Sequence, residues 1–365
     1  MNSMRNLLDA QGGCFPPQRL AAFAVTRSGY VLALRLKKRF KGLTVFSPAM
    51  LKNHGLLKTA GAAFGRLDGL IFICASGIAV RAIAPHLKGK HLDPAVIVMD
   101  EKGVFVISLL SGHLGGANEL AREIASFLKA TPVITTATDN AGLACVEDIA
   151  ERFSLTIEDV KKIKSANSAI LSKGRVSIVD ADAKRLSAMK RAFGESGVFT
   201  FDAKLAQRPG IKAFILVSNK ARPVVPKAAA GRTLLLRPRE FAVGIGCRRG
   251  AGRRQIARAV KAAFDAASLS MLCIRNIATI DLKRGETGLT LFARSFKLPI
   301  EYFKSSELRT IKTLSGPSLF VLATTGSPAV AEPAALLSAK AKTLWIKKLK
   351  SDRVTVAAAR VSSRS

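Results

Sequence analysis

The sequence predicts an α/β protein of several domains, in which parallel or mixed sheets are flanked by helices in three layers at both the N-terminal and the C-terminal end. Three observations lead to this prediction. The chain has 365 residues, enough for two or three domains with separate cores. Hydrophobic residues make up 48% and aromatic residues only 6% of it, which indicates aliphatic cores. Short β-branched runs alternate with helical patterns, an order typical of parallel sheets.

The N-terminal domain is expected over residues 20–153, after a loose leader at 1–19. Its strands are expected at short apolar runs: 22–26, 43–46, 70–74, 95–99 and 104–109. Its helices are expected where apolar residues recur at helical spacing: 28–36, 56–67, 80–84, 120–129 and 143–153. The run at 104–110 is apolar and β-branched, as expected of a strand buried on both faces.

A middle region, 154–240, has a less distinctive pattern. Three strands are expected there, at 175–179, 213–217 and 233–236, with one helix at 184–193. The C-terminal domain, 241–361, again alternates strands and helices. Its strands are expected at 242–247, 274–281, 300–303, 319–323, 343–346 and 354–358. Its helices are expected at 256–264, 287–296 and 329–338.

The stretch from Gly103 to Asp139 carries most of the candidate chemistry. Its segment Ser-Gly-His-Leu-Gly-Gly-Ala-Asn-Glu, at 111–119, has small residues that let the backbone turn tightly and approach a ligand. Asn118 or Ser111 is expected to cap the following helix, whose free N–H groups suit a carboxylate or phosphate.

His113 and Glu119 place two titratable groups at this turn, where acid–base chemistry is expected. His113 is compatible with three roles: general base, hydrogen-bond donor to a carboxylate, or capping residue. Its position between glycines favours function over a packed core histidine.

Further polar residues follow predicted strands, where α/β folds gather their ligands. Asp100 lies in a turn between two strands, and Asp139 ends the run Thr-Thr-Ala-Thr-Asp. Four strand ends are expected to place the following turns around clefts: Cys74, Leu110, Thr135 and Cys247. Thiols at strand ends such as Cys74 and Cys247 are more often small buried residues than nucleophiles.

A glycine-containing turn, Gly244–Gly250, follows a predicted strand and precedes a helix. Its glycine spacing is one residue too long for a dinucleotide fingerprint, so a nicotinamide site is not expected. A tight turn that presents amides and the guanidinium groups of Arg248 and Arg249 to a carboxylate fits better. A plain strand–helix turn is the alternative.

The charge balance is strongly basic: 58 Lys and Arg residues against 25 Asp and Glu give a formal net charge of +33. Such a field attracts polyanions, although only the segments 35–39 and 347–350 are dense in basic residues. The basic residues are therefore explained equally well by a solvated surface and by a surface that binds a polyanion. No RRM, KH or helix-turn-helix pattern occurs, so specific nucleic-acid binding ranks last.

Five cysteines without a CxxC pair indicate reduced, cytoplasmic thiols and argue against a zinc site. No metal ligands are therefore expected. The N-terminus is not followed by the apolar region of a secretory signal. No apolar run approaches the roughly 18–20 residues of a membrane helix. The expected location is thus the cytoplasm, with no membrane partner.

Several blocks resemble the cobalt-precorrin-5A hydrolase family, the ring-contraction enzymes of the anaerobic, early-cobalt cobalamin pathway. The blocks are Phe72–Pro85, Asp93–Gly103, Ser111–Glu119, Val133–Asp139, Val243–Gly250, Ile277–Lys283 and Lys350–Val356. The resemblance covers nearly all of 21–360, and the Ser-Gly-His-Leu-Gly-Gly-Ala-Asn-Glu-Leu block is highly specific. The chain departs from the family at 346–351, where the family more often has a proline and a glutamine.

The resemblance implies an enzyme that opens the ring A δ-lactone of cobalt-precorrin-5A and releases the C20 fragment as acetaldehyde, giving cobalt-precorrin-5B. Cobalt then arrives with the tetrapyrrole substrate, no cofactor of the protein's own is implied, and transient contacts with neighbouring pathway enzymes are expected. A non-catalytic tetrapyrrole carrier is the alternative, since it needs the same binding groups but no base.

The residues expected to act in catalysis are His113, Glu119 and Asp100. Those expected to bind substrate are Ser76, Gly77, Arg81, Ser111, Gly112, Gly115, Gly116, Asn118, Thr135, Thr136, Asp139, Gly244, Gly246, Arg248 and Arg249.

Overall fold

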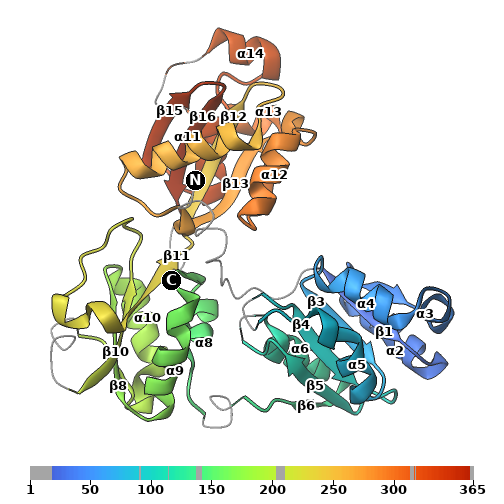
Figure 1. The fold of residues 1–365 in the computed structure, drawn as a ribbon. Coiled ribbons are helices and arrows are strands. Elements are labelled where there is room, and N and C mark those ends of the chain that lie inside the picture. Colours follow the sequence, from blue (N-terminus) through green and yellow to red (C-terminus); the bar gives the residue numbers. More distant parts are fainter. Residues whose placement is uncertain are drawn as a thin grey trace. The chain divides into compact units, whose positions relative to one another are not determined.

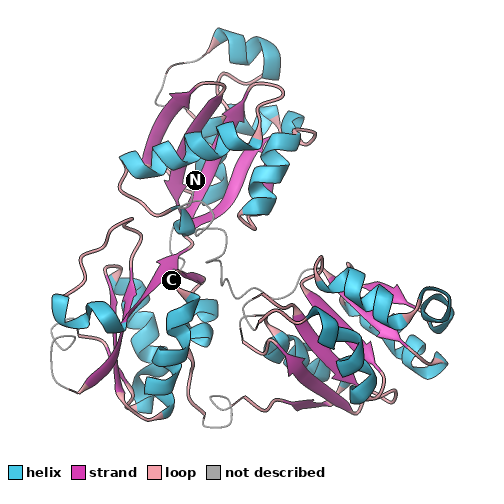
Figure 2. Ribbon diagram, in the orientation of Figure 1, coloured by secondary structure: helices cyan, strands magenta, loops and turns pink. Residues whose placement is uncertain are grey.

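The structure is a computed structural model that describes residues 19–89, 92–113, 115–136, 142–202, 210–312, 316 and 318–361. It contains three sheets flanked by helices (Figures 1 and 2), which confirms the expected α/β class with mixed sheets. The described residues form two compact units, one of 19–152 with 160–174 and the other of 153–159 with 175–361. Most of the expected leader, and Asp139, lie outside the described residues.

The first unit contains a six-stranded sheet in the order β2-β1-β3-β4-β5-β6. Its strands are β1 (Leu20–Ala24), β2 (Thr44–Phe46), β3 (Gly69–Ile73), β4 (Ala95–Met99), β5 (Phe105–Leu110) and β6 (Thr131–Val133). Strands β1 to β4 run parallel, as their alternation with helices predicts. Strand β5 is antiparallel to β4, and β6 is parallel to β5.

The chain reverses direction between β4 and β5 because of Asp100. Its carboxylate accepts backbone N–H groups from Lys102, Val104 and Phe105 at 3.0, 2.9 and 2.7 Å. These bonds close a tight turn directly after β4, as Asp side chains commonly do in turns.

The reversal places Leu110 beside Val96, at the start of β4. The loop after β5 therefore lies at the opposite edge of the sheet from the loops after β1, β3 and β4. The expectation that this strand is buried on both faces is wrong, since Val106 is the only buried residue of β5. An antiparallel strand near a sheet edge can leave one face to solvent.

Helices cover both faces of this sheet and enclose separate aliphatic cores. Helices α2 (Arg27–Arg39) and α6 (Ala117–Leu128) pack on one face. Helices α3 (Pro48–His54), α4 (Leu56–Phe64) and α5 (Ser76–Ile83) pack on the other. Two further helices of this unit, α8 (Val146–Arg152) and α9 (Ile163–Leu171), contact each other.

The second unit contains two five-stranded sheets, and the first has the order β7-β11-β10-β8-β9. Its strands are β7 (Leu155–Ile157), β8 (Arg175–Asp180), β9 (Phe199–Thr200), β10 (Ile211–Val217) and β11 (Thr233–Pro238). Helix α10 (Ala183–Phe193) follows β8. The sequence predicted three of these strands and the helix; the two remaining strands, β7 and β9, have only three and two residues.

The other sheet has the order β14-β13-β12-β16-β15. Its strands are β12 (Phe241–Cys247), β13 (Ile274–Ile280), β14 (Ile300–Phe303), β15 (Ile346–Ser351) and β16 (Val354–Arg360). Helices α11 (Arg253–Ala266) and α12 (Thr287–Ser295) pack on one face. Helices α13 (Ser305–Arg309) and α15 (Ala331–Ala339) pack on the other, which gives three layers again.

Two predicted elements of this region are wrong. The run expected as a strand at 319–323 forms helix α14 (Leu319–Thr325), whose first turn is capped by the Ser318 hydroxyl accepting the Val321 N–H at 3.4 Å. Periodicity alone cannot separate a short apolar strand from a helical segment. The strand expected at 343–346 begins only at Ile346.

None of the described helices combines the length and apolar character that a bilayer crossing requires.

Candidate active site

The loop between β5 and α6 is compact because its glycines leave no room for side chains. Ser111 has a φ of 57°, a left-handed conformation that is uncommon for residues with a β-carbon. A β-carbon on Gly115 would lie 2.4 Å from that of Ser111. A β-carbon on Gly112 would lie 2.7 Å from Oδ1 of Asn118. The two glycines are therefore required for the packing of the loop itself.

The start of α6 does not offer all the free N–H groups that the sequence predicted. The N–H of Ala117 donates to the Ser111 carbonyl at 3.2 Å, and that of Asn118 to the Gly112 carbonyl at 2.9 Å. Gly116 precedes the helix with a φ of 77°, and no side chain caps it, so the expected cap by Asn118 or Ser111 is wrong. Since these two amides are already paired, an anion at this loop could use them only by breaking those bonds.

Asn118 connects the loop to β5 and to the segment after β6 instead. Its Oδ1 accepts the Ser108 hydroxyl at 2.7 Å, and its Nδ2 donates to the Thr136 hydroxyl at 3.0 Å. Asn118 is buried, whereas Thr135 is exposed. The predicted residues on the loop and those after β6 thus lie at one edge of the sheet.

Ser111 carries a hydroxyl group whose hydrogen bonding is incomplete. The residue is buried, and its Oγ has no hydrogen-bond partner in the described part of the chain. A buried polar atom without a partner is rare, and strained backbone is concentrated at functional positions. Ser111 therefore has the features of a group that pairs with a ligand.

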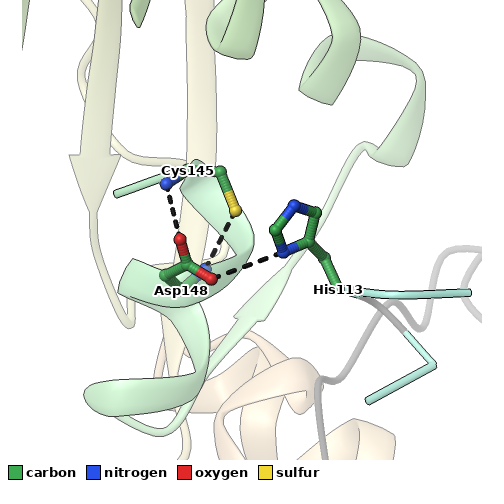
Figure 3. A group of neighbouring side chains, drawn as sticks. All are labelled: His113, Cys145 and Asp148. Carbon is green, nitrogen blue, oxygen red and sulfur yellow. Dashed lines mark hydrogen bonds and ion pairs between the residues drawn. The ribbon is translucent and has the colours of Figure 1, made fainter. Parts of the chain in front are cut away.

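The carboxylate beside His113 belongs to Asp148, in the first turn of α8 (Figure 3). Nδ1 of His113 lies 3.5 Å from Oδ1 of Asp148, and the imidazole is only 15% exposed. Both residues belong to the same compact unit. Asp148 is not among the residues predicted from the sequence, because only the fold brings it to the loop after β5.

Cys145 completes this cluster. Its backbone N–H donates to Oδ2 of Asp148 at 2.7 Å, and the Asp148 N–H donates to its Sγ at 3.4 Å. The reciprocal pair is a capping box in which a cysteine occupies the position usually held by serine or threonine. The ligand-forming atoms of His113, Cys145 and Asp148 lie within 4.8 Å of one another.

The electrostatics keep Asp148 ionised and Cys145 neutral. Burial alone would raise the pKa of Asp148, but the contacts with His113 and the Cys145 N–H outweigh it, so this pKa is lowered. An ionised carboxylate at Nδ1 favours the tautomer with the proton on that nitrogen and leaves Nε2 as the basic atom. Burial, together with the negative charges of Glu147 and Asp148, strongly raises the pKa of Cys145.

The other two predicted catalytic residues have different surroundings. Glu119 is exposed, and its carboxylate lies 3.4 Å from Nη1 of Arg122 in the same helix. Asp100 closes the turn after β4, at the opposite edge of the sheet. Catalytic roles for Glu119 and Asp100 stay predictions, while the carboxylate that faces His113 is that of Asp148.

A pocket of about 310 Å³ lies at the carboxyl ends of β3 and β4, as expected for the strand that leads to Cys74. It is lined by Cys74, Ala75, Ser76, Val98, Asp100, Glu101, Phe105, Ile107 and Val133. Burial, reinforced by the charge of Glu101, raises the pKa of Cys74 to about 11, so the thiol is neutral at neutral pH.

The predicted residues of the N-terminal sheet therefore divide into two groups. Ser76, Gly77 and Arg81 lie on α5 beside this pocket, and the Arg81 guanidinium donates to the Gly77 carbonyl at 3.1 Å. His113 lies at the other edge. The five residues of β4 span roughly 16 Å at about 3.3 Å per residue, which is the distance that separates the two groups along the sheet.

In the second unit, the glycines of the turn after β12 differ in their role. A β-carbon on Gly244 would lie 1.8 Å from the carbonyl oxygen of Ala331, so this glycine lets α15 pack directly on β12. A β-carbon on Gly246 would meet nothing closer than 3.7 Å. Packing therefore accounts for Gly244, and substrate contacts at both glycines stay predictions.

The amides of this turn are largely used within the fold. The N–H of Gly250 donates to Oε2 of Glu286 at 3.1 Å, and that of Arg248 to the Arg353 carbonyl at 2.9 Å. The side chains of Arg248 and Arg249 are exposed. Guanidinium groups, more than backbone amides, are thus what this turn presents to an anion.

Comparisons with known proteins agree on one pathway. Two family models match, described as "Cobalamin synthesis G N-terminal" over residues 58–139 and "Cobalamin synthesis G C-terminus" over 241–359. The cobalt-precorrin-5A hydrolase of Salmonella typhimurium is 35% identical over 339 residues, which cover 90% of this chain and 94% of that protein. The cobalt-precorrin-5A hydrolase of Priestia megaterium is 31% identical over 352 residues, covering 93% and 94%. A solved structure of a cobalamin biosynthesis protein G homolog from Sulfolobus solfataricus is 22% identical, covers 98% of this chain and 100% of its own, and has a TM-score of 0.40.

Proposed function

The chain belongs to the cobalt-precorrin-5A hydrolase family, and we propose that it opens the ring A δ-lactone of cobalt-precorrin-5A and releases the C20 fragment as acetaldehyde. The product of this reaction is cobalt-precorrin-5B. Similarity to two hydrolases over about nine tenths of the chain supports this function more strongly than that of a carrier. The structural observation that carries the proposal is the paired imidazole and carboxylate of His113 and Asp148 beside the buried Ser111 hydroxyl.

Lactone opening needs a base for the attacking water and a donor for the developing oxyanion. His113 supplies the base at Nε2, because Asp148 favours the proton on Nδ1. Ser111 supplies the donor, since its hydroxyl is buried and has no partner among the described residues. Water adds to the lactone carbonyl, and the ring C–O bond breaks to give a carboxylate and a free alcohol.

Release of acetaldehyde follows from the alcohol that lactone opening creates. A base removes the proton of this hydroxyl group, a carbonyl forms at C20, and the bond between C20 and the macrocycle breaks, so that the two-carbon fragment containing C20 leaves as acetaldehyde. The bonding electron pair passes into the conjugated macrocycle, which is then reprotonated. The macrocycle is thus the electron sink, and the proposed reaction uses no cofactor of the protein's own.

Substrate binding is proposed to depend on arginines. The tetrapyrrole carries acetate and propionate carboxylates, which guanidinium groups bind with paired hydrogen bonds. Exposed arginines at positions proposed to bind substrate are Arg81, Arg248 and Arg249. The net charge of +33 favours the approach of a polyanionic substrate.

We also propose a cytoplasmic location, supported by the free state of Cys74, Cys145, Cys247 and Cys273.

The proposal is tested by incubating the purified protein anaerobically with cobalt-precorrin-5A. Acetaldehyde and the lactone-opened tetrapyrrole are expected, both identified by mass spectrometry. Affinity for the tetrapyrrole is measured separately, in wild type and in His113→Ala. Tight binding without acetaldehyde from the wild-type protein would support the carrier and contradict the enzyme.

A further inference from the structure

We propose that His113, Cys145 and Asp148 form a binding site for one divalent transition-metal ion of the zinc or cobalt(II) class. This ion is held by the protein and is distinct from the cobalt in the substrate. The inference goes beyond the proposed function, in which the protein binds no metal. It also departs from the sequence-based expectation of no metal ligands, which considered cysteine spacing and not the fold.

The three side chains offer the donor set that such ions prefer. An imidazole nitrogen, a thiolate sulfur and a carboxylate oxygen are all common zinc ligands, and the sulfur selects against magnesium and calcium. These atoms lie within 4.8 Å of one another, and Nδ1 of His113 and Oδ1 of Asp148 are 3.5 Å apart. Ligands about 2.0–2.3 Å from a tetrahedral zinc ion lie about 3.5 Å from each other. The nitrogen–oxygen pair already has this spacing, and the sulfur lies within 4.8 Å of the ligand atoms of the other two residues.

Hydrogen bonds orient two of the ligands, Cys145 and Asp148. The Cys145 N–H binds Oδ2 of Asp148, so Oδ1 faces His113 (Figure 3). The Asp148 N–H points at the Cys145 sulfur at 3.4 Å. Hydrogen bonds of this kind commonly fix the orientation of metal ligands. Three protein ligands also leave a fourth position of the ion open.

Burial and charge suit a cation at this position. Cys145 is fully buried and His113 largely so, whereas the Asp148 side chain is 41% exposed and provides a route of entry. The buried carboxylate of Glu147 lies in the same helical turn, where it accepts the Asn167 Nδ2 group at 2.6 Å. Two carboxylates therefore lie together in a chain that is otherwise strongly basic.

A capping box alone explains only part of this arrangement. It accounts for the reciprocal bonds between Cys145 and Asp148, and a serine in place of the cysteine serves equally well. It does not account for His113, which comes from a different loop and faces Oδ1 of the cap. A metal on Nδ1 also displaces the proton to Nε2, so the metal-bound chain lacks the base used in the proposed reaction.

The test measures metal binding apart from turnover. Protein freed of metal and of any histidine tag is titrated with Co²⁺ and, separately, with Zn²⁺. One ion per chain is expected, with a thiolate-to-cobalt charge-transfer band in the Co²⁺ spectrum. Cys145→Ser keeps the capping box but loses the sulfur ligand. Loss of an outer-shell partner alone typically costs about 10–100-fold in affinity, so we expect binding to weaken by at least about 100-fold and the band to vanish. Cys247→Ser, which removes a free thiol in the other compact unit, is the matched control.

Two results would overturn the proposal: no stoichiometric ion in the wild-type protein, or equal affinity in Cys145→Ser and wild type. Circular dichroism of each variant checks that the fold is retained, and His113→Ala provides a second ligand variant outside the helix cap. Release of acetaldehyde by the metal-free protein is measured in parallel. Release without metal binding contradicts only this inference, whereas metal binding without release contradicts only the proposed function.

Discussion

At the scale of single residues, the proposed chemistry centres on His113. Its own loop supplies the buried Ser111 hydroxyl, and α8 supplies the Asp148 carboxylate. We predict that His113→Ala folds normally and loses about 10²–10⁴-fold in turnover, the range of a general acid–base group. Acetaldehyde release gives the rate, and thermal unfolding checks the fold. A rate near that of wild type would reduce His113 to a turn or binding element.

The structure favours Asp148 over Glu119 as the carboxylate that orients His113. Asp148 lies 3.5 Å from the imidazole, whereas Glu119 is exposed and pairs with Arg122. We therefore expect Asp148→Asn to lower turnover by at least about tenfold. This loss is part of the roughly 10²–10⁴-fold rate enhancement that a general base supplies. The pH profile of the rate should also change. Glu119→Gln is expected to lose less. The reverse order would favour the carboxylate that the sequence pointed to.

Much of this site is predictable from residue types, and part of it is not. The small residues of 111–116 predict a tight turn, and the structure brings Ser111, His113, Asn118 and Thr136 to one edge. The approach of Asp148 depends on how distant segments fold together, which no local pattern encodes. A Cys-x-x-Asp sequence before an apolar run does resemble a capping box, but cysteine is an unusual residue for it.

At the scale of elements, the contact between β12 and α15 depends on a missing side chain. We predict that Gly244→Ala lowers the free energy of unfolding by about 1–3 kcal/mol, or more, because its β-carbon would lie 1.8 Å from the Ala331 carbonyl oxygen. Gly246→Ala is the matched control, since its nearest contact is 3.7 Å. Urea denaturation measures both. Equal stability of the two variants would mean that α15 shifts without cost.

The loop that joins α12 to the strand before it is held by Glu286. Its Oε1 lies 2.9 Å from Nζ of Lys283, and Oε2 accepts the Gly250 N–H at 3.1 Å. Burial alone would raise the pKa of Glu286, but these two contacts outweigh it and lower the pKa below its ordinary value of 4.5. The unfolded chain therefore binds this proton more readily, so the stabilisation is present above pH 4.5 and is lost as the pH falls through the lowered pKa.

We accordingly expect Glu286→Gln to cost about 1 kcal/mol at neutral pH and almost nothing in strong acid. Denaturant titrations of wild type and variant across acidic pH give the difference. Glu195→Gln, which removes a carboxylate from an exposed position, is measured in the same way as the control. A constant difference at every pH would rule out the ionised carboxylate as its source.

Elements were predictable where pattern and length agreed. Strand β4, at Ala95–Met99, and β14, at Ile300–Phe303, match their predicted ranges. The direction of β5 was not predictable from its apolar run, because Asp100 reverses the chain through bonds to three amides. The prediction of a strand at 319–323 was wrong for a different reason. A short apolar run suits a strand and a helix equally well, and here the Ser318 hydroxyl caps a helix.

At the scale of the whole molecule, composition predicted the α/β class but left the meaning of its charge undecided. A net charge of +33 attracts any polyanion, and specific recognition requires charges at defined positions. Exposed arginines at the turn after β12 and exposed lysines at the end of α2 contribute equally to net charge. The arginines directly follow the end of β12, where α/β folds gather ligands, whereas the lysines lie at an exposed helix end.

This difference gives the last prediction. Replacing Arg248 or Arg249 by glutamine should weaken tetrapyrrole binding by about 1–3 kcal/mol each, because a charge-assisted hydrogen bond to a carboxylate is lost while the exposed position keeps folding stability unchanged. Lys37→Gln and Lys38→Gln remove the same charge from an exposed helix end and should change affinity far less. Titration of all four variants with the tetrapyrrole, at low and at physiological salt, separates the two cases. If the charges act only as a diffuse electrostatic field, the arginine and lysine variants should lose equal affinity, and both losses should vanish as salt is added. If the arginines bind carboxylates directly, only their variants should lose affinity, and the loss should persist at physiological salt.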